Sequence, residues 1–201
     1  MCPFVMRLAN QWYLLYFAAT SCSHPAKPTG AIVPKDSVDK SGYYIDSKKP
    51  VTSVSTGKTT PAELIAFARS LTGVPYKFGS ADPAKGFDCS GFITYVFNHF
   101  GIIVPRQSAD FTSMKREIDI KEAKPGDLIL FTGTDSTKRI VGHMGIIVSA
   151  PGEETRFIHS TSGKADGVTE TSLKPYYVGR YMKTIRIFPQ NDNEGGTKKA
   201  R

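Results

Sequence analysis

The order of hydrophobic patterns along the chain restricts its fold more than any other feature. Two helical patterns come first, one between Thr60 and Gly73 and one between Asp88 and Gly101. Five short β-type runs come later and cover residues 128–131, 143–148, 155–159, 167–171 and 181–188. Helices grouped ahead of strands, rather than alternating with them, are typical of α+β domains. We therefore predict an α+β domain in which N-terminal helices pack on a five- to six-stranded, mainly antiparallel sheet.

Both helical patterns carry start and stop signals. Thr60 and Glu63 form a capping box around Pro61, which takes the first helical position. Asp88 is a favourable N-cap for the second helix, and Gly101 ends it. The apolar residues of this second helix recur at helical spacing: Phe92, Ile93, Val96, Phe97 and Phe100. We expect this helix to lie at the centre of the domain.

The first 21 residues have the layout of a secretory signal. Arg7 is the only charged side chain there, and the apolar block WYLLYFAA follows at residues 12–19. The run ATSC that ends at Cys22 resembles the lipobox of bacterial lipoproteins, whose signal is cut before a cysteine that then carries lipid. We predict a lipoprotein signal peptide over residues 1–21 and lipidation of Cys22. A buried N-terminal helix with an incidental cysteine is the alternative.

Three further segments are distinguished by composition. Residues 22–59 are rich in Pro, Lys, Ser and Thr without helical period, which predicts a flexible linker behind the lipidated cysteine. We expect the folded domain over residues 60–189 and a polar tail over residues 190–201.

Lys and Arg number 26 against 18 Asp and Glu, and the resulting net charge of +8 favours anionic surroundings without choosing among them. No apolar run reaches the roughly 18 residues of a membrane-spanning helix.

Cys89 follows Asp88 directly and therefore lies in the first helical turn. The unpaired N–H groups and the dipole of a helix start stabilise a thiolate, so we expect a thiol pKa below the value of about 8.5 for free cysteine. We expect Gly91 to leave room for a substrate at this turn.

Two histidines are candidates to act with Cys89. His143 opens one apolar run and His159 closes another, so a sheet facing the helix could bring both to the thiol. A core cysteine with structural histidines is one alternative. A zinc site is another, although no two of these residues have the close spacing of structural zinc ligands.

Six segments follow one another in a characteristic order. They are VPYKFGS at 74–80, FDCSGF at 87–92, PRQS at 105–108, PGDLILF at 125–131, GHMGIIV at 142–148 and FIHSTSG at 157–163. In this order they resemble the NlpC family of bacterial cell-wall cysteine peptidases, over residues 60–188. The resemblance implies a papain-like α+β fold, with Cys89 as nucleophile, His143 as base and His159 as the third catalytic residue. It implies no metal or organic cofactor, and we expect protonation of His159 near pH 6.5 to lower activity.

The same resemblance implies three substrate contacts, and a fourth is predicted from the sequence. Tyr76 matches the aromatic hydroxyl ahead of the cysteine, and Asp88 and Ser90 match contacts to a substrate amine. Each also has a structural alternative, as core aromatic, helix cap and first-turn residue respectively. Arg106 is predicted to bind a substrate carboxylate, with a structural salt bridge as the alternative. Phe78 and Ser80 depart from the Trp and Gly usual in the family.

The resemblance makes peptidoglycan stem peptides the expected substrate and the γ-D-glutamyl–meso-diaminopimelate bond the first choice. The alternatives are a D,D-endopeptidase that cuts cross-links, a papain-like acyltransferase and a non-catalytic wall-binding module. The expected partners are peptidoglycan peptides and a membrane, through the lipid on Cys22, and not nucleic acid. We expect a monomeric, exported bacterial lipoprotein that faces the periplasm or cell wall.

Overall fold

The computed structural model describes residues 51–195. The predicted signal peptide, Cys22, most of the linker and residues 196–201 lie outside the described residues. The helices are α1 (Pro61–Ser70) and α2 (Cys89–His99), with 3-10 turns η1 (Ser108–Ser113), η2 (Ile120–Glu122), η3 (Val178–Arg180) and η4 (Pro189–Gly195). The strands are β1 (Ala81–Asp82), β2 (Gly86–Phe87), β3 (Glu117–Ile118), β4 (Leu128–Thr132), β5 (Val141–Ile147), β6 (Arg156–Thr161), β7 (Gly167–Ser172) and β8 (Tyr181–Ile185).

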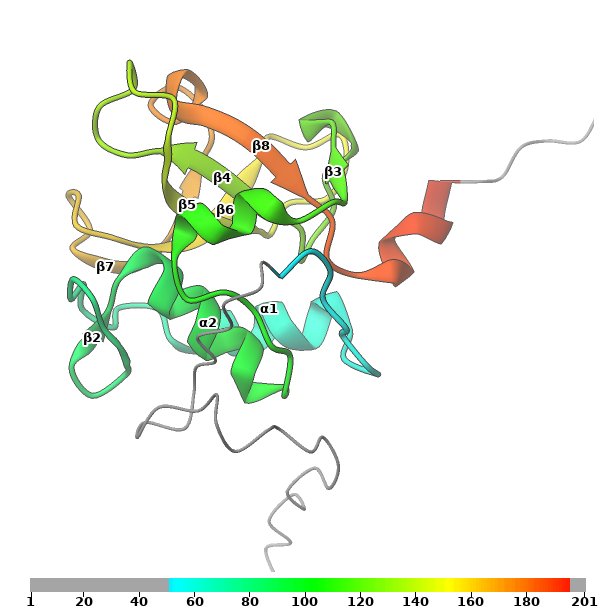
Figure 1. Ribbon diagram of the computed structural model, residues 1–201, viewed down its shortest axis with the longest axis horizontal. Helices are drawn as coiled ribbons and strands as arrows, with labels where there is room; N and C mark the ends of the chain where they lie inside the picture. Colours follow the sequence, from blue (N-terminus) through cyan, green and yellow to red (C-terminus); the bar gives the residue numbers. More distant parts are fainter. Residues whose placement is uncertain (1–50, 196–201) are drawn as a thin grey trace, which may run out of the picture. The chain divides into compact units, whose positions relative to one another are not determined.

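The main sheet has six strands in the order β3-β8-β4-β5-β6-β7, and each neighbouring pair is antiparallel. Both helices precede most of the sheet in sequence, and Figure 1 shows them together on one side of it. This arrangement confirms the predicted α+β class. No helix within residues 51–195 is long and apolar enough to cross a membrane.

The helix starts follow the predicted caps. Thr60 and Glu63 form the reciprocal capping box of α1. Asp88 caps α2, and its side chain accepts a hydrogen bond from the Gly91 N–H. These bonds satisfy N–H groups that the first turn leaves without an acceptor, which fixes where each helix begins.

The core confirms the central position of α2. Its buried side chains pack with one face of the sheet in a cluster that includes Phe92, Ile93, Val96, Phe97, Leu128, Leu130, Met144, Ile146 and Ile158. A second cluster includes Ile129, Phe131, Ile147, Phe157 and Tyr177. Successive residues of β4 alternate between the two clusters because side chains alternate across a strand. Strand β4 is therefore buried on both faces, and it reads as a continuous apolar run for that reason.

Ordered structure begins before Thr60. Val51 and Val54 pack against the core, Thr56 is buried, and the Thr52 carbonyl accepts a hydrogen bond from Lys115. The predicted linker over residues 22–59 is therefore too long at its C-terminal end. Tertiary contacts hold residues 51–59, and such contacts leave no local sequence period.

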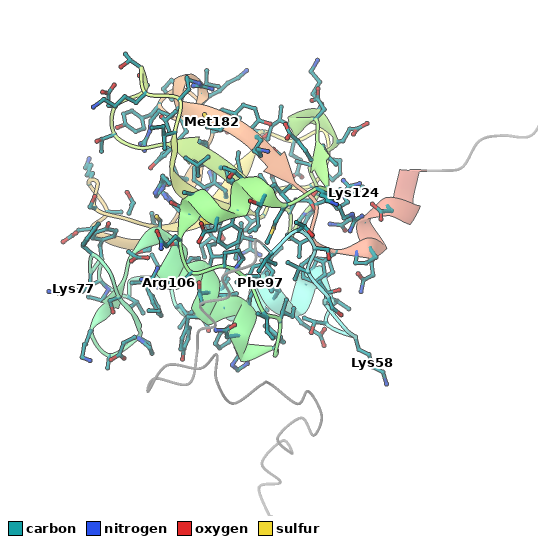
Figure 2. All side chains as sticks on the ribbon, viewed as in Figure 1. Lys58, Lys77, Phe97, Arg106, Lys124 and Met182 are labelled. Carbon is teal, nitrogen blue, oxygen red and sulfur yellow. The ribbon has the colours of Figure 1, made fainter. Side chains whose placement is uncertain are left out.

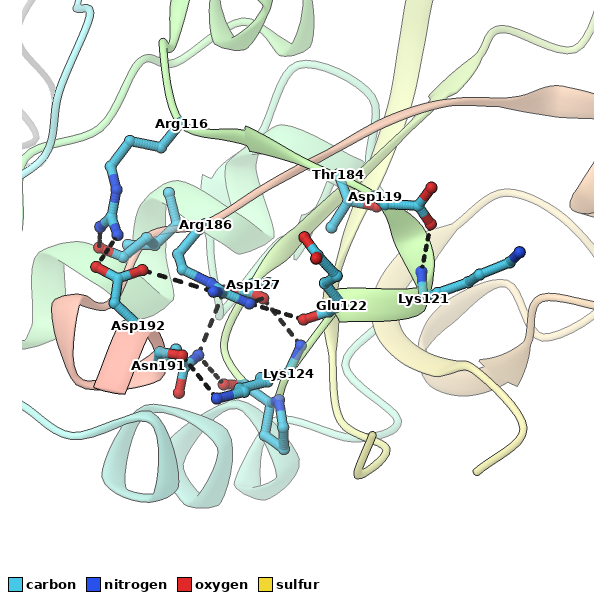
Figure 3. Close-up of polar contacts among 12 residues, drawn as sticks. Arg116, Asp119, Lys121, Glu122, Lys124, Asp127, Thr184, Arg186, Asn191 and Asp192 are labelled. Carbon is cyan, nitrogen blue, oxygen red and sulfur yellow. Dashed lines mark hydrogen bonds and ion pairs between the residues drawn. The ribbon is translucent and has the colours of Figure 1, made fainter. Parts of the chain in front are cut away.

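Ordered structure also continues past the expected end at residue 189. Asn191 is buried, and its Nδ2 donates to the fully buried Asp127 at 3.3 Å. Arg186 pairs with the same carboxylate at 3.4 Å, and Lys124 Nζ donates to the Asn191 carbonyl at 2.7 Å, as Figure 3 shows. The predicted polar tail over residues 190–201 is therefore wrong for its first residues, which complete a buried polar network.

The sequence patterns did not predict the three shortest strands. Strand β3 adds a sixth strand at one edge, and β1 and β2 form a separate two-stranded hairpin. Each of these strands has two residues, which is too short to show a periodic pattern. The hairpin matters for the site because it leads directly into Asp88 and α2.

Candidate active site

Cys89 is the first residue of α2. Asp88, just before it, caps the helix and accepts a 2.6 Å hydrogen bond from the Gly91 N–H. The N–H groups of Cys89 and Ser90 have no intrahelical acceptor at this position. The Cys89 thiol donates to the Gly142 carbonyl at 3.9 Å, which places the sulfur beside the start of β5.

His143, His159 and Thr171 form a hydrogen-bonded chain across the neighbouring strands β5, β6 and β7. His143 Nε2 lies 2.7 Å from His159 Nδ1, and His159 Nε2 lies 3.0 Å from Thr171 Oγ1. Phe157 is the register partner of Thr171, so Thr171 is the diagonal neighbour of His159. Both histidines are buried.

Two arrangements of protons fit the hydrogen bonds among His143, His159 and Thr171, and they differ in whether His143 Nδ1 carries a proton or a lone pair. In one, His143 Nε2–H donates to His159 Nδ1, and His159 Nε2–H donates to the Thr171 hydroxyl. In the other, all donors are reversed, and His143 carries its proton on Nδ1. Only the first arrangement leaves a lone pair on His143 Nδ1, so it is the one in which His143 can act as a base.

Burial keeps both histidines neutral. Desolvation first, then electrostatic interactions with His159 and Arg180, lower the pKa of His143 well below 6.5. Desolvation and the Arg180 guanidinium lower the pKa of His159 to about 3. The expected titration of His159 near pH 6.5 is therefore wrong, because a buried imidazole beside a guanidinium resists protonation.

The structure also contradicts the expected low pKa of Cys89. Burial first, then the Asp88 carboxylate, raise the pKa of the thiol to about 11. The N–H groups of Ser90 and Cys89 lower the pKa, as the helix-start argument requires, but their effect is outweighed. The resting site therefore holds a neutral thiol beside a neutral imidazole.

A cavity of about 980 Å³ opens at the thiol, and we call it the Cys89 cavity. Cys89, His143 and Tyr76 all line it, so the structure brings these predicted residues together. Tyr76 is partly buried, and burial, Cys89 and Asp88 raise the pKa of its phenol. The hydroxyl is therefore a proton donor at neutral pH. The rest of the lining comes from the β4–β5 and β6–β7 ends and from η3: Gly133, Thr134, Gly142, Thr161, Ser162, Gly163, Lys164, Ala165, Thr169, Thr171, Tyr176, Tyr177 and Arg180.

Asp88, Ser90 and Arg106 form one compact network at the start of α2. The Arg106 guanidinium donates to both carboxylate oxygens of Asp88, at 2.9 and 2.6 Å, and to Ser90 Oγ at 2.9 Å. Figure 2 labels Arg106 at this end of the helix. The structure therefore favours the salt bridge over a substrate-carboxylate contact for Arg106. Substrate contacts by Asp88 and Ser90 stay predictions, since both side chains are buried and neither lines the Cys89 cavity.

Gly91 has a different role from the expected one. A Cβ atom there would lie 2.1 Å from the Ser80 carbonyl oxygen. The glycine therefore accommodates the incoming hairpin backbone rather than a substrate. Phe78 is 86% exposed, and neither it nor Ser80 lines the Cys89 cavity.

The zinc alternative has no matching ligand group in the part of the chain that the structure describes. No three His, Cys, Asp or Glu side chains are grouped there to hold a metal ion. His143 and His159 use facing ring nitrogens to bind each other instead.

The sequence model of the NlpC/P60 family matches residues 73–186, which is more than half of the chain. The chain belongs to the NlpC/P60 family. The match includes Cys89, His143, His159 and Thr171.

Named relatives agree with this membership. The gamma-DL-glutamyl hydrolase of Bacillus subtilis (strain 168) is 31% identical over 177 residues, which cover 87% of this chain and 40% of that protein. The murein DD-endopeptidase MepS/murein LD-carboxypeptidase of Escherichia coli (strain K12) is 31% identical, over 59% of this chain and 58% of that protein. The chain thus spans less than two thirds of either relative. It spans 78% of the probable endopeptidase NlpC of Escherichia coli (strain K12), at 32% identity.

Solved structures agree as well. An NlpC/P60 family protein from Bacillus cereus ATCC 10987 superposes with a TM-score of 0.58 at 28% identity. The superposition covers 67% of this chain and 42% of that one. The shared fold agrees with the observed helices and antiparallel sheet.

Sequence reasoning missed two residues of this NlpC/P60 site. Thr171 supplies the hydroxyl at the end of the hydrogen-bonded series His143–His159–Thr171. Arg180 lowers the pKa of both histidines. Thr171 lies in a β-type run in which alternate residues share a face, and this alternation was the only signal. No local sequence pattern indicates Arg180, because the tertiary structure, and not the order of residues, brings η3 next to the site.

The arrangement suits nucleophilic attack on a carbonyl group. The Cys89 thiol can act as a nucleophile, and in the first proton arrangement His143 Nδ1 keeps a lone pair that can accept a proton. The first-turn N–H groups of α2 and the Tyr76 hydroxyl are hydrogen-bond donors of the kind that stabilise a tetrahedral oxyanion. This is the chemistry of acyl transfer from an amide or ester to a thiol.

Proposed function

We propose that this NlpC/P60 protein is a cysteine peptidase that hydrolyses amide bonds in peptidoglycan stem peptides. The observation that carries the proposal is the Cys89 cavity, which is lined both by the thiol and by a His143 ring hydrogen-bonded to His159. The names of the relatives, which are murein and glutamyl hydrolases, support the substrate class.

Acylation begins with a neutral pair. His143 Nδ1 takes the thiol proton as the sulfur attacks the carbonyl carbon, so the two events are concerted rather than sequential. The Cys89 N–H and the Tyr76 hydroxyl hold the developing oxyanion. His143 then gives its proton to the leaving amine, and the acyl group stays on the sulfur.

Deacylation repeats the cycle with water. His143 Nδ1 takes a proton from the water molecule that attacks the thioester, and the thiol leaves with that proton. His159 accepts the His143 Nε2–H throughout, which keeps the imidazole plane fixed as its charge changes.

The bond that we propose as substrate joins γ-D-glutamate to meso-diaminopimelate. The Bacillus subtilis relative, named as a gamma-DL-glutamyl hydrolase, supports this choice. The Escherichia coli relative, named as a DD-endopeptidase, favours cross-link cleavage as the second candidate. Retention of Cys89, His143 and His159 argues against a purely wall-binding module.

Digestion of purified sacculi and defined muropeptides, with mass analysis of the products, tests the proposal. We expect the wild-type protein to release fragments cut after γ-D-glutamate, and Cys89→Ala and His143→Ala to release none. His99→Gln is the matched control, since His99 is exposed and lies outside the Cys89 cavity. Cleavage at D,D cross-links would replace the proposed bond, and full activity of Cys89→Ala would overturn the mechanism.

We also propose that the protein is exported and anchored by lipid on Cys22. The proposal rests on the signal-like residues 1–21 and the ATSC run. We expect the full chain to fractionate with membranes and Cys22→Ala to leave them or to stay uncleaved. A wild-type protein that is soluble with residues 1–21 attached would contradict the anchor.

A further inference from the structure

Arg180 is a buried cation that has no counter-ion among residues 51–195. It is 9% exposed, its Nη2 donates to the Thr132 carbonyl at 2.9 Å, and its Nε is buried without a partner. Among the described residues it takes part in no ion pair. Arg186 also has a buried Nε without a partner, but it differs from Arg180 in pairing with two carboxylates, Asp127 and Asp192.

Leaving a guanidinium in this state is unfavourable. A buried charge needs a partner of opposite sign or a full set of hydrogen bonds to offset its lost hydration. The Tyr177 and Tyr176 rings lie 5.1 and 5.6 Å from the guanidinium carbon and stabilise it in part. The Thr132 carbonyl and a side-chain hydrogen bond with Tyr177 use only part of its five N–H donors, and none of these partners carries a negative charge.

The position of Arg180 indicates where a further hydrogen-bond acceptor for its guanidinium can come from. It lines the Cys89 cavity together with Cys89 and His143. Lys164, on the exposed turn between β6 and β7, is the second cation of the lining, and no Asp or Glu takes part in it. The charged side chains of the lining are therefore both positive, and a negative group that enters the cavity meets no carboxylate in its lining.

We propose that Arg180 binds a carboxylate of the substrate on a residue next to the scissile amide. The inference rests on the proposed function and adds the chemistry of one subsite. A γ-linked glutamyl residue keeps its α-carboxylate free, and diaminopimelate brings a second one. Either carboxylate supplies the planar pair of oxygens that a guanidinium binds best.

Amidated substrates show which of the two carboxylates binds Arg180. Four stem peptides are compared: the free acid, the peptide amidated on D-glutamate, the peptide amidated on diaminopimelate, and the doubly amidated peptide. Loss of one charge-assisted hydrogen-bonded contact corresponds to about 10- to 100-fold. We expect wild-type kcat/KM to fall by that factor for one of the two amidations, which identifies the bound carboxylate.

The Arg180 variants decide whether this residue is responsible. We expect Arg180→Gln to lower kcat/KM for the free acid and to reduce the acid-to-amide ratio to within about twofold, because the charge that discriminates is gone. Arg180→Lys keeps a charge and should keep part of the ratio. Arg139→Gln, which removes an exposed arginine outside the Cys89 cavity, should leave the ratio unchanged.

Binding to Cys89→Ala protein, measured by calorimetry, gives a readout that does not depend on turnover. If wild-type protein cleaves none of the four peptides, the proposed function fails, but an acid preference that Arg180→Gln removes still supports the subsite. The subsite is overturned if acid and amide peptides bind alike or if Arg180→Gln keeps the preference. It is also overturned if Lys164→Gln alone removes the preference.

Discussion

The Nε2 atom of His143 lies 2.7 Å from the Nδ1 atom of His159, and both rings are buried. With His143 as base, its proton sits on Nε2 and His159 accepts it, so the third catalytic position works as an acceptor. A neutral acceptor orients the imidazole but stabilises an imidazolium less than a carboxylate does. The first two predictions test this relationship.

Replacing His159 should slow turnover without abolishing it. His159→Ala removes the acceptor, and we expect kcat/KM to fall by about 10- to 1000-fold. His159→Asn should retain more activity, because its amide oxygen can take the place of Nδ1 and accept from His143. Steady-state rates on a defined muropeptide measure both. Wild-type activity of His159→Ala would make His159 a structural residue.

Thr171 should act through His159 and affect kcat more than KM. Thr171→Val keeps the shape but removes the oxygen that accepts His159 Nε2–H, so we expect kcat to fall about 2- to 10-fold. Thr171→Ser keeps the hydroxyl and should restore the rate. An unchanged kcat in the valine variant, or equal losses in both variants, would show that the hydroxyl does not hold the tautomer.

The acid limb of the pH profile should lie well below pH 6.5. His143 must be neutral to act as base, and its lowered pKa keeps it neutral until the pH falls through that lower value. The thiol, with a pKa of about 11, stays protonated across the neutral range, so kcat/KM should be flat there. An inflection at or above pH 6.5 would instead indicate a preformed thiolate–imidazolium pair.

Alkylation of Cys89 should accelerate continuously with pH. A thiol with a pKa of about 11 contains more thiolate at each higher pH, so the rate should show no plateau between pH 7 and roughly pH 9. Iodoacetamide labelling of a Cys2→Ala/Cys22→Ala protein, which keeps only Cys89, measures this beside N-acetylcysteine. A plateau below the pKa of the free thiol would restore the expectation of an activated thiolate.

Arg106 should contribute to stability by pairing with Asp88, whose side chain is 11% exposed. Arg106→Gln leaves that carboxylate buried without its partner, and we expect the free energy of unfolding to fall by about 2–4 kcal/mol in urea titrations. Asp88→Asn in addition should recover part of the loss, since asparagine also caps helices.

The control for this pair is an exposed ion pair. Arg69 binds Glu170 with side-chain exposures of 52% and 26%, so Arg69→Gln should cost about 1 kcal/mol or less. If Arg106→Gln costs no more than Arg69→Gln, then Arg106 does not stabilise the start of α2, and a role in substrate binding regains support.

The local features of this protein could be read from its sequence. Thr60 and Asp88 marked both helix starts because capping is decided by a few neighbouring residues. The five longer strands overlap the predicted β-type runs, although β8 ends at Ile185 rather than at residue 188, and the order of helices and strands indicated the α+β class. Cys89, His143 and His159 were found through a helix start, two strand positions and a family resemblance.

Only the tertiary structure decided the electrostatics of the site. The same helix start that lowers the pKa of Cys89 is buried beside Asp88, and burial outweighs it. Thr171 and Arg180 reach the histidines through strand pairing and η3, and residues 51–59 and Asn191 join the domain through distant contacts. Desolvation and partner choice depend on what the whole fold places around a group. The sequence therefore indicated Cys89, His143 and His159, whereas the fold added Thr171 and Arg180 and determined the protonation of the site.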